Sequence, residues 1–68
     1  MLYANQNNID LAKQILHEEM GMAGKAVDGG RIETMVAEVL DTAYSIGGSY
    51  NETTIRSIVK SMIARNIL

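Results

Sequence analysis

Apolar residues recur at helical spacing in three segments of the chain, which glycine clusters separate. In the middle segment, from Gly30 to Ile46, apolar side chains follow one another at steps of four, three, four and three residues. This spacing gathers them on one side of an α-helix and predicts an amphipathic helix. Gly47 and Gly48 follow it, and glycine favours the left-handed conformation that commonly closes a helix. Asn66 is expected to play the same part after the third segment.

The first segment predicts a helix from Asn8 to Met20, with Asn7 or Asn8 as its N-terminal cap. Glu19 projects into its apolar side. Because an unpaired buried charge is costly, either the helix frays before Glu19 or the carboxylate meets a cation there. The apolar side is formed by Ile9, Leu11, Ala12, Ile15, Leu16 and Met20.

The third segment predicts a helix that begins near Asn51, where two caps compete. Ser49 with Glu52 makes a capping box, whereas Asn51 as cap goes with a hydrophobic staple between Tyr50 and Ile55. Either cap starts the helix at about the same place. The apolar stripe consists of Ile55, Ile58, Val59, Met62 and Ile63.

These segments predict an all-α fold, because the chain has no proline and no sustained strand-like alternation. Three short helices with one apolar side each are expected to pack as a single compact three-helix domain over residues 1–68. A chain of 68 residues without cysteine, and with one histidine, has neither disulfides nor an ordinary structural zinc site to stabilise it. Dimerisation is therefore one way in which we expect the domain to be completed.

The composition indicates a folded protein with an adaptable apolar surface. Apolar residues make up 47% of the chain, with five Met and no Phe or Trp, and methionine fills irregular space without fixing one arrangement. No apolar run approaches the length of a membrane span, and the first residues lack the pattern of a signal peptide. We expect a cytoplasmic protein with no membrane partner.

The glycine-rich stretch between the first two helices raises the question of a phosphate-binding loop. Such a loop requires a glycine five residues before the Gly-Lys pair and a hydroxyl after it. Counting from Gly24 and Lys25, these positions hold Glu19 and Ala26. We expect a flexible connection instead. As an alternative, the first helix continues across the glycines to a turn at residues 28–30.

Candidate catalytic chemistry is sparse. His17 is the only imidazole, and no carboxylate or second histidine lies three or four residues from it. Glu18 and Glu19 are adjacent, so on a helix they point about 100° apart and do not form a catalytic pair. We expect no enzyme activity, no catalytic or metal-binding residue and no cofactor.

Charge is distributed unevenly along the chain. Residues 1–52 contain all eight acidic residues and three cations, whereas residues 53–68 contain only Arg56, Lys60 and Arg65 as charged groups. These cations either neutralise the acidic second helix, favour the negative end of their own helix, or contact a nucleic acid. The net charge of −2 and the isoelectric point of about 5.1 argue against a nucleic-acid partner.

The spacing of the third segment nevertheless supports DNA binding as the alternative function. The tight helix-turn-helix motif fits only with an insertion of about two residues, because the later positions that the motif requires to be apolar fall on Thr53 and Arg56. By contrast, NETTIRSIVKSMIARNIL, residues 51–68, resembles the third helix of winged-helix regulators. That resemblance implies a recognition helix on which Thr53, Arg56, Ser57 and Lys60 face the nucleic acid.

The preferred interpretation is a small non-catalytic helical module that acts by protein–protein interaction. Its partner is itself or another protein, and a homo-oligomer is expected, since a short chain without covalent or metal braces gains most from sharing its apolar surface. The residues expected in the core or the interface are Met35, Val39, Leu40, Ile58, Met62, Ile63, Ile67 and Leu68.

Overall fold

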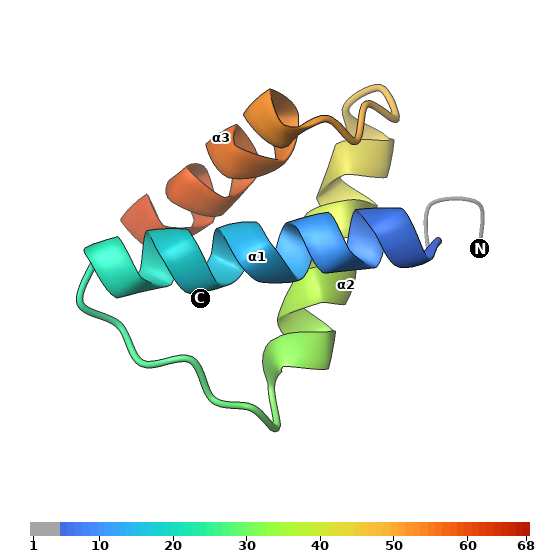
Figure 1. The fold of residues 1–68 in the computed structure, drawn as a ribbon. Coiled ribbons are helices and arrows are strands. Elements are labelled where there is room, and N and C mark those ends of the chain that lie inside the picture. Colours follow the sequence, from blue (N-terminus) through green and yellow to red (C-terminus); the bar gives the residue numbers. More distant parts are fainter. Residues whose placement is uncertain (1–4) are drawn as a thin grey trace.

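The computed structural model describes residues 5–68 and confirms an all-α fold of three helices (Figure 1). The helices are α1 (Gln6–Met22), α2 (Ile32–Ser45) and α3 (Glu52–Ala64). Residues 5–68 contain no strand. The Cα trace measures 31 × 21 × 17 Å, which is a compact body for three helices.

Each helix packs against the other two around one apolar core. In Figure 1, α1 crosses in front of α2 at a steep angle, and the carboxyl-terminal half of α3 lies close to that of α1. The core therefore forms within one chain, with every member at most 6% exposed: Ala12, Ile15, Leu16, Met20, Met35, Val36, Val39, Leu40, Ala43, Ile55, Ile58, Val59 and Met62.

An asparagine caps two of the three helices. The Asn5 side chain accepts a hydrogen bond from the backbone N–H of Asn8 at 2.9 Å, so α1 begins two residues earlier than expected and the prediction of Asn7 or Asn8 as cap was wrong. Several polar residues compete at that end, and spacing alone does not choose among them. For α3 the cap is Asn51, which accepts from the N–H of Thr54 at 2.9 Å. The alternative capping box is not the one used.

The start of α2 has no side-chain cap. The Asp28 carboxylate accepts from the N–H of Gly30 at 2.8 Å, and the Asp28 carbonyl accepts from that of Arg31 at 2.9 Å. This turn occupies the residues at which we expected the helix to begin. The first helical residue is therefore Ile32, two positions later than predicted.

All three helices end in the same hydrogen-bond pattern, in which a residue with positive φ reverses the backbone. Gly24, Gly47 and Asn66 occupy this position, with φ of 73°, 135° and 58°. The next residue donates its N–H back to the carbonyl five positions earlier: Lys25 to Met20 at 2.8 Å, Gly48 to Ala43 at 2.9 Å and Ile67 to Met62 at 2.9 Å. The predicted ends at Gly47 and Asn66 are confirmed.

The connection between α1 and α2 corrects two expectations. The first helix passes through Glu19 and Gly21 to end at Met22, so it neither frays early nor continues to residues 28–30. Gly24 stops it. The Lys25 ammonium donates to the Asn66 side-chain carbonyl at 3.1 Å and to the Leu68 backbone carbonyl at 3.3 Å. This lysine ties the connection to the residues that follow α3.

Candidate interaction surface

Arg56, on the second turn of α3, binds three carboxylates. Its Nη1 donates to Glu19 at 2.6 Å, and its Nη2 donates to Glu18 and to Glu52, each at 2.8 Å. Glu19 is only 6% exposed. Of the two alternatives considered for Glu19, the structure therefore shows the cation, and it comes from a residue 37 positions away in the chain. We refer to these four residues as the Arg56 cluster.

The cluster shifts the pKa values of Arg56 and Glu18. The hydrogen bonds that the guanidinium donates to Glu52, Glu18 and Glu19 hold the pKa of Arg56 above its usual range. The pKa of Glu18 lies below its usual value of 4.5, because Arg56 and then Gln14 donate hydrogen bonds to the ionised carboxylate. Both shifts favour the charged forms, so the cluster persists at neutral pH.

The other cations of the third helix are free of ion pairs within residues 5–68. Arg56 neutralises acids of α1 and the first turn of α3 and not the second helix, which was one of the three roles considered for these cations. Lys60 and Arg65 are exposed and form no ion pair with any residue that the structure describes. Two uncompensated positive charges therefore remain here, Lys60 within α3 and Arg65 at its C-terminal cap.

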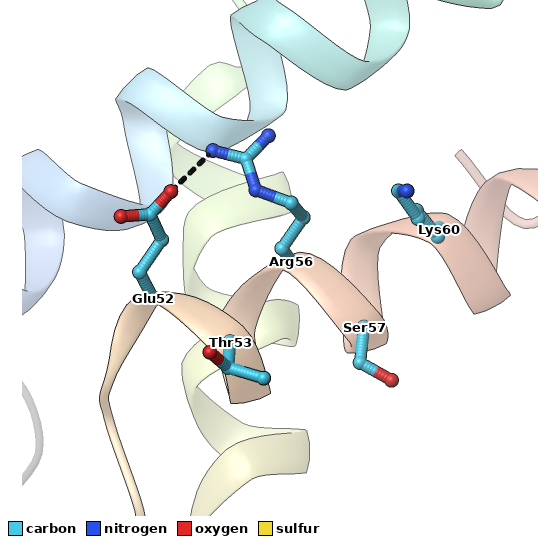
Figure 2. A pocket seen from close by; sticks show the side chains of 5 residues that line it. All are labelled: Glu52, Thr53, Arg56, Ser57 and Lys60. Atoms are coloured by element: carbon cyan, nitrogen blue, oxygen red, sulfur yellow. Dashed lines mark hydrogen bonds and ion pairs between the residues drawn. The ribbon is translucent and has the colours of Figure 1, made fainter.

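The four candidate nucleic-acid contacts do not all face the same way. Figure 2 shows the Arg56 guanidinium directed toward α1, whereas Thr53 and Ser57 point away from it. Thr53, Ser57 and Lys60 are exposed. Together with Glu52 and Arg56 they line a shallow depression of about 350 Å³ that α3 alone forms. A ligand at this depression meets Lys60 as its only unpaired cation.

The eight residues expected in the core or the interface occupy three environments. Five of them are buried within the single chain, two are half-buried, and Ile67 is 46% exposed. The buried residues are Met35, Val39, Leu40, Ile58 and Met62, and the half-buried ones are Ile63 and Leu68.

Two large apolar side chains that were not singled out as interface candidates are the most exposed of their kind among residues 5–68. Met22, the last residue of α1, is 72% exposed, and Ile46, directly after α2, is 64% exposed. Ile46 belongs to the apolar stripe of its helix by spacing. Because the helix ends before it, that side chain leaves the core.

Two apolar grooves run beside the exposed side of α3. The α1–α3 groove has a volume of about 280 Å³ and is lined by Glu19, Met22, Ala23, Lys60, Ile63 and Ala64. The α2–α3 groove has a volume of about 220 Å³ and is lined by Thr42, Ile46, Ser57, Ile58, Ser61, Met62 and Arg65.

Small side chains separate the two grooves. Ser57, Ser61 and Ala64 are exposed and stand four and three residues apart, so they form a low ridge along α3. Each groove contains one strongly exposed apolar side chain and one of the free cations. We call this ridge with its two grooves the α3 face.

The remaining candidate residues do not assemble into a site. His17 is exposed on α1. Within residues 5–68 no group of three histidine, cysteine or acidic residues is arranged to hold a metal ion. None of the three helices combines the length and apolar character needed to cross a bilayer.

Comparison with known proteins gives no match: neither a protein-family model, nor a curated protein, nor a solved structure is similar to this chain. Its function is therefore inferred from the α3 face and the Arg56 cluster alone.

Proposed function

We propose that the chain is a small non-catalytic helical module that acts by protein–protein interaction through the α3 face. The observation that carries the proposal is the pair of grooves with Met22 and Ile46 exposed at them. Large apolar side chains that cluster on a protein surface mark an interaction site when the patch is contiguous and rimmed by polar residues. Here Lys60 and Arg65 supply such a rim.

The small side chains of the ridge support the same proposal. Helices pack at axial distances that depend on the side chains at the contact, and small side chains permit the closest approach. Ser57, Ser61 and Ala64 leave room for a partner helix to lie along α3 while its apolar side chains enter the grooves. An amphipathic helix that docks in a groove is a common mode of recognition.

DNA binding by α3 is the alternative function, and its support is narrower. Thr53, Ser57 and Lys60 are exposed and polar. To reach a phosphate, however, Arg56 would have to leave three carboxylates, one of which is buried. Leaving a buried charged acceptor without its donor is unfavourable. The geometry therefore favours a protein partner.

Site-specific cross-linking tests the proposal. The chain has no cysteine, so Ala64→Cys provides a unique attachment point for a photoreactive probe on the α3 face. We expect irradiation in the native cell extract to give one discrete protein adduct. Glu38→Cys on the exposed side of α2 is the matched control and is expected to give none.

Two further measurements complete this test. Adding Ile46→Glu to the Ala64→Cys variant is expected to abolish the adduct, because a charge then enters the α2–α3 groove. Binding of a fluorescent DNA duplex is measured in parallel between about 50 and 200 mM salt. Equal labelling from both cysteines, together with DNA binding that weakens steeply with salt and on Lys60→Ala, would favour the alternative function instead.

The homo-oligomer expected from the sequence stays a prediction. Sedimentation equilibrium over a wide concentration range measures it directly. A dimer that Ile46→Glu dissociates would assign the α3 face to a second copy of the chain. A monomer at every concentration would direct the search to another protein.

A further inference from the structure

We infer that the partner of the α3 face is an acidic amphipathic helix of another protein, with glutamate or aspartate beside its apolar stripe. The inference rests on the proposed function and specifies the chemistry of the partner. Three properties of the face carry it: the charges left free on it, the consequence of pairing it with itself, and the shape of its grooves.

The free charges of the face are both positive. Lys60 lies at the α1–α3 groove and Arg65 at the α2–α3 groove, and neither forms an ion pair within residues 5–68. The nearby acids Glu19 and Glu52 are held by Arg56. Complementary charge across an interface speeds association and selects the correct partner. A partner that carries one carboxylate on each side of its apolar stripe satisfies both cations.

A symmetric contact between two copies lacks this complementarity. A twofold interface brings the same residues together from both subunits. The α3 face would then present Lys60 and Arg65 to the same two cations of the second copy, and the one carboxylate that lines its grooves, Glu19, is buried and bound to Arg56. Like charges placed against each other disfavour an association. The α3 face is therefore better suited to a different chain.

In a head-to-tail contact, the α3 face of one copy would bind the exposed side of α2 of another copy. That side of α2 does not have the properties that the α3 face requires of a partner. It offers the acids Glu38 and Asp41, with Thr34, Ala37 and Ser45 around them. The large exposed side chain of this helix is Tyr44, and a single aromatic ring does not fill both the groove at Met22 and the groove at Ile46. The partner needs both the acids and the apolar anchors on one helix.

The grooves fix where those anchors enter. They lie on opposite sides of the low ridge, so a helix that straddles the ridge places one row of side chains in each groove. Each groove is large enough to receive an aliphatic side chain such as leucine. The carboxylates then fall at the outer edges of the two rows, next to Lys60 and Arg65.

The experiment uses two synthetic helical peptides with identical leucine stripes. One carries glutamate beside the stripe and the other carries lysine at the same positions. Fluorescence anisotropy measures the dissociation constant of each peptide for the full chain. We expect the acidic peptide to bind on the order of tenfold more tightly, with a preference that decreases as salt rises.

Two double variants of the chain separate local from overall charge. Lys60→Glu/Arg65→Glu is expected to invert the preference, so that the basic peptide binds more tightly. Lys13→Glu/Arg31→Glu makes the same change of net charge away from the α3 face and is expected to leave the preference for the acidic peptide in place. NMR shift changes caused by the acidic peptide should centre on Ile63 and Ile46.

The other outcomes overturn the inference. Equal affinity for both peptides, binding of neither peptide, or a preference that Lys60→Glu/Arg65→Glu does not alter would each exclude an acidic helix. If the acidic peptide fails while Ala64→Cys still gives a discrete adduct, or Ile46→Glu dissociates a dimer, the proposed function stands and only the partner is wrong. If those two tests also fail, the proposed function fails with it.

Discussion

Glu19 is the one buried charged residue among residues 5–68. Its buried carboxylate needs a charged hydrogen-bond donor, and Arg56 supplies it. Its carboxylate lies on the apolar side of α1, where water does not solvate it. The guanidinium reaches it from α3 at 2.6 Å through Nη1 and donates from Nη2 to Glu18 and Glu52. Guanidinium is suited to this role, because it is planar, always charged and rich in donors. The cluster thereby joins α1 to α3 by specific hydrogen bonds.

Replacing Arg56 by methionine is expected to destabilise the fold. Methionine keeps much of the apolar stem but leaves the Glu19 carboxylate buried without its donor. We expect the melting temperature to fall by roughly 5–15 °C. Lys60→Met is the matched control, since Lys60 lies one turn further along α3 and forms no ion pair within the described residues.

The control is expected to move the melting temperature by no more than about 3 °C. The double variant Glu19→Met/Arg56→Met should regain much of the lost stability, because it removes the buried charge together with its partner. Circular dichroism melts of the four proteins decide the matter. Equal losses in Arg56→Met and Lys60→Met would show that Glu19 does not depend on Arg56.

The titration of Glu18 provides a second test of the Arg56 cluster. Its pKa is lowered in the folded protein, first by Arg56 and then by Gln14. A carboxyl group whose folded pKa is depressed stabilises the fold above its unfolded pKa, and this contribution is lost as the pH falls through the folded value. We therefore expect stability to decline as the pH drops below about 4.5.

NMR of the Glu18 carboxyl carbon measures the shift directly. The titration midpoint is expected below 4.5 in the unmodified chain and higher in Arg56→Met. Gln14→Ala should raise it by a smaller amount, because Gln14 is the weaker donor in this pair. A midpoint that Arg56→Met leaves unchanged would contradict the assigned cause.

At the scale of the element, the helices are delimited by residues that tolerate a left-handed backbone. Gly24, Gly47 and Asn66 end the three helices by the same pair of backward hydrogen bonds. Gly21 differs, because it lies inside α1 without a positive φ. Gly21 therefore has the helical backbone conformation, whereas Gly24, three residues later, has the left-handed one.

Alanine substitutions at these two glycines are expected to have opposite effects. An added Cβ meets no atom within 4 Å at either position, so backbone conformation alone decides the outcome. Gly21→Ala should stabilise the fold by about 0.5–1 kcal/mol, since alanine restricts the unfolded chain and favours the helix. Gly24→Ala should destabilise it by about 1–2 kcal/mol, because φ is +73° there.

Urea unfolding of the two variants measures both values. Gly24→Asn is the control for backbone conformation and should cost less than Gly24→Ala, because asparagine visits the left-handed region more readily. Stabilisation by Gly24→Ala would mean that α1 continues beyond Met22.

At the scale of the whole molecule, a chain of 68 residues depends on a small core. Its total free energy of unfolding is expected at roughly 3–10 kcal/mol for this length. Aliphatic residues and methionine fill the core, with no phenylalanine or tryptophan in the chain. Each large buried side chain therefore contributes a sizeable part of the stability.

Leu40 and Ile46 provide a matched pair for this prediction. Leu40 is buried on α2, whereas Ile46 follows the same helix and is strongly exposed. Leu40→Ala is expected to cost about 2–5 kcal/mol, which approaches the total for so small a domain. Ile46→Ala should stay within about 0.5 kcal/mol. Urea unfolding measures the change in the free energy of unfolding for each variant. Comparable losses of stability in the two variants would mean that the Ile46 side chain is buried in solution.

The burial of Met62 determines which substitution in the α2–α3 groove tests binding at the α3 face. Met62 is buried, so Met62→Glu would disrupt the core and would not report on binding alone. Ile46→Glu changes the same groove at an exposed position. Ile46→Glu is the cleaner test of the α3 face.

The sequence by itself determined the three helices, the core side of each and two of their three terminators. These features follow from local periodicity and from the backbone preferences of glycine and asparagine, which act within a few residues. It also showed that Glu19 requires a cation if the first helix continues past it. It did not choose between Asn5 and its neighbours as a cap, because several adjacent side chains offer the same hydrogen bond.

Only the tertiary structure decided which cation meets Glu19 and which apolar residues face water. Periodicity gives the apolar side of one helix but not how the next helix is rotated against it. The pairing of Arg56 with an acid 37 residues away depends on that rotation. The exposure of Met22 and Ile46 depends on where α1 and α2 stop relative to α3, and the α3 face exists because those two ends meet the same side of that helix.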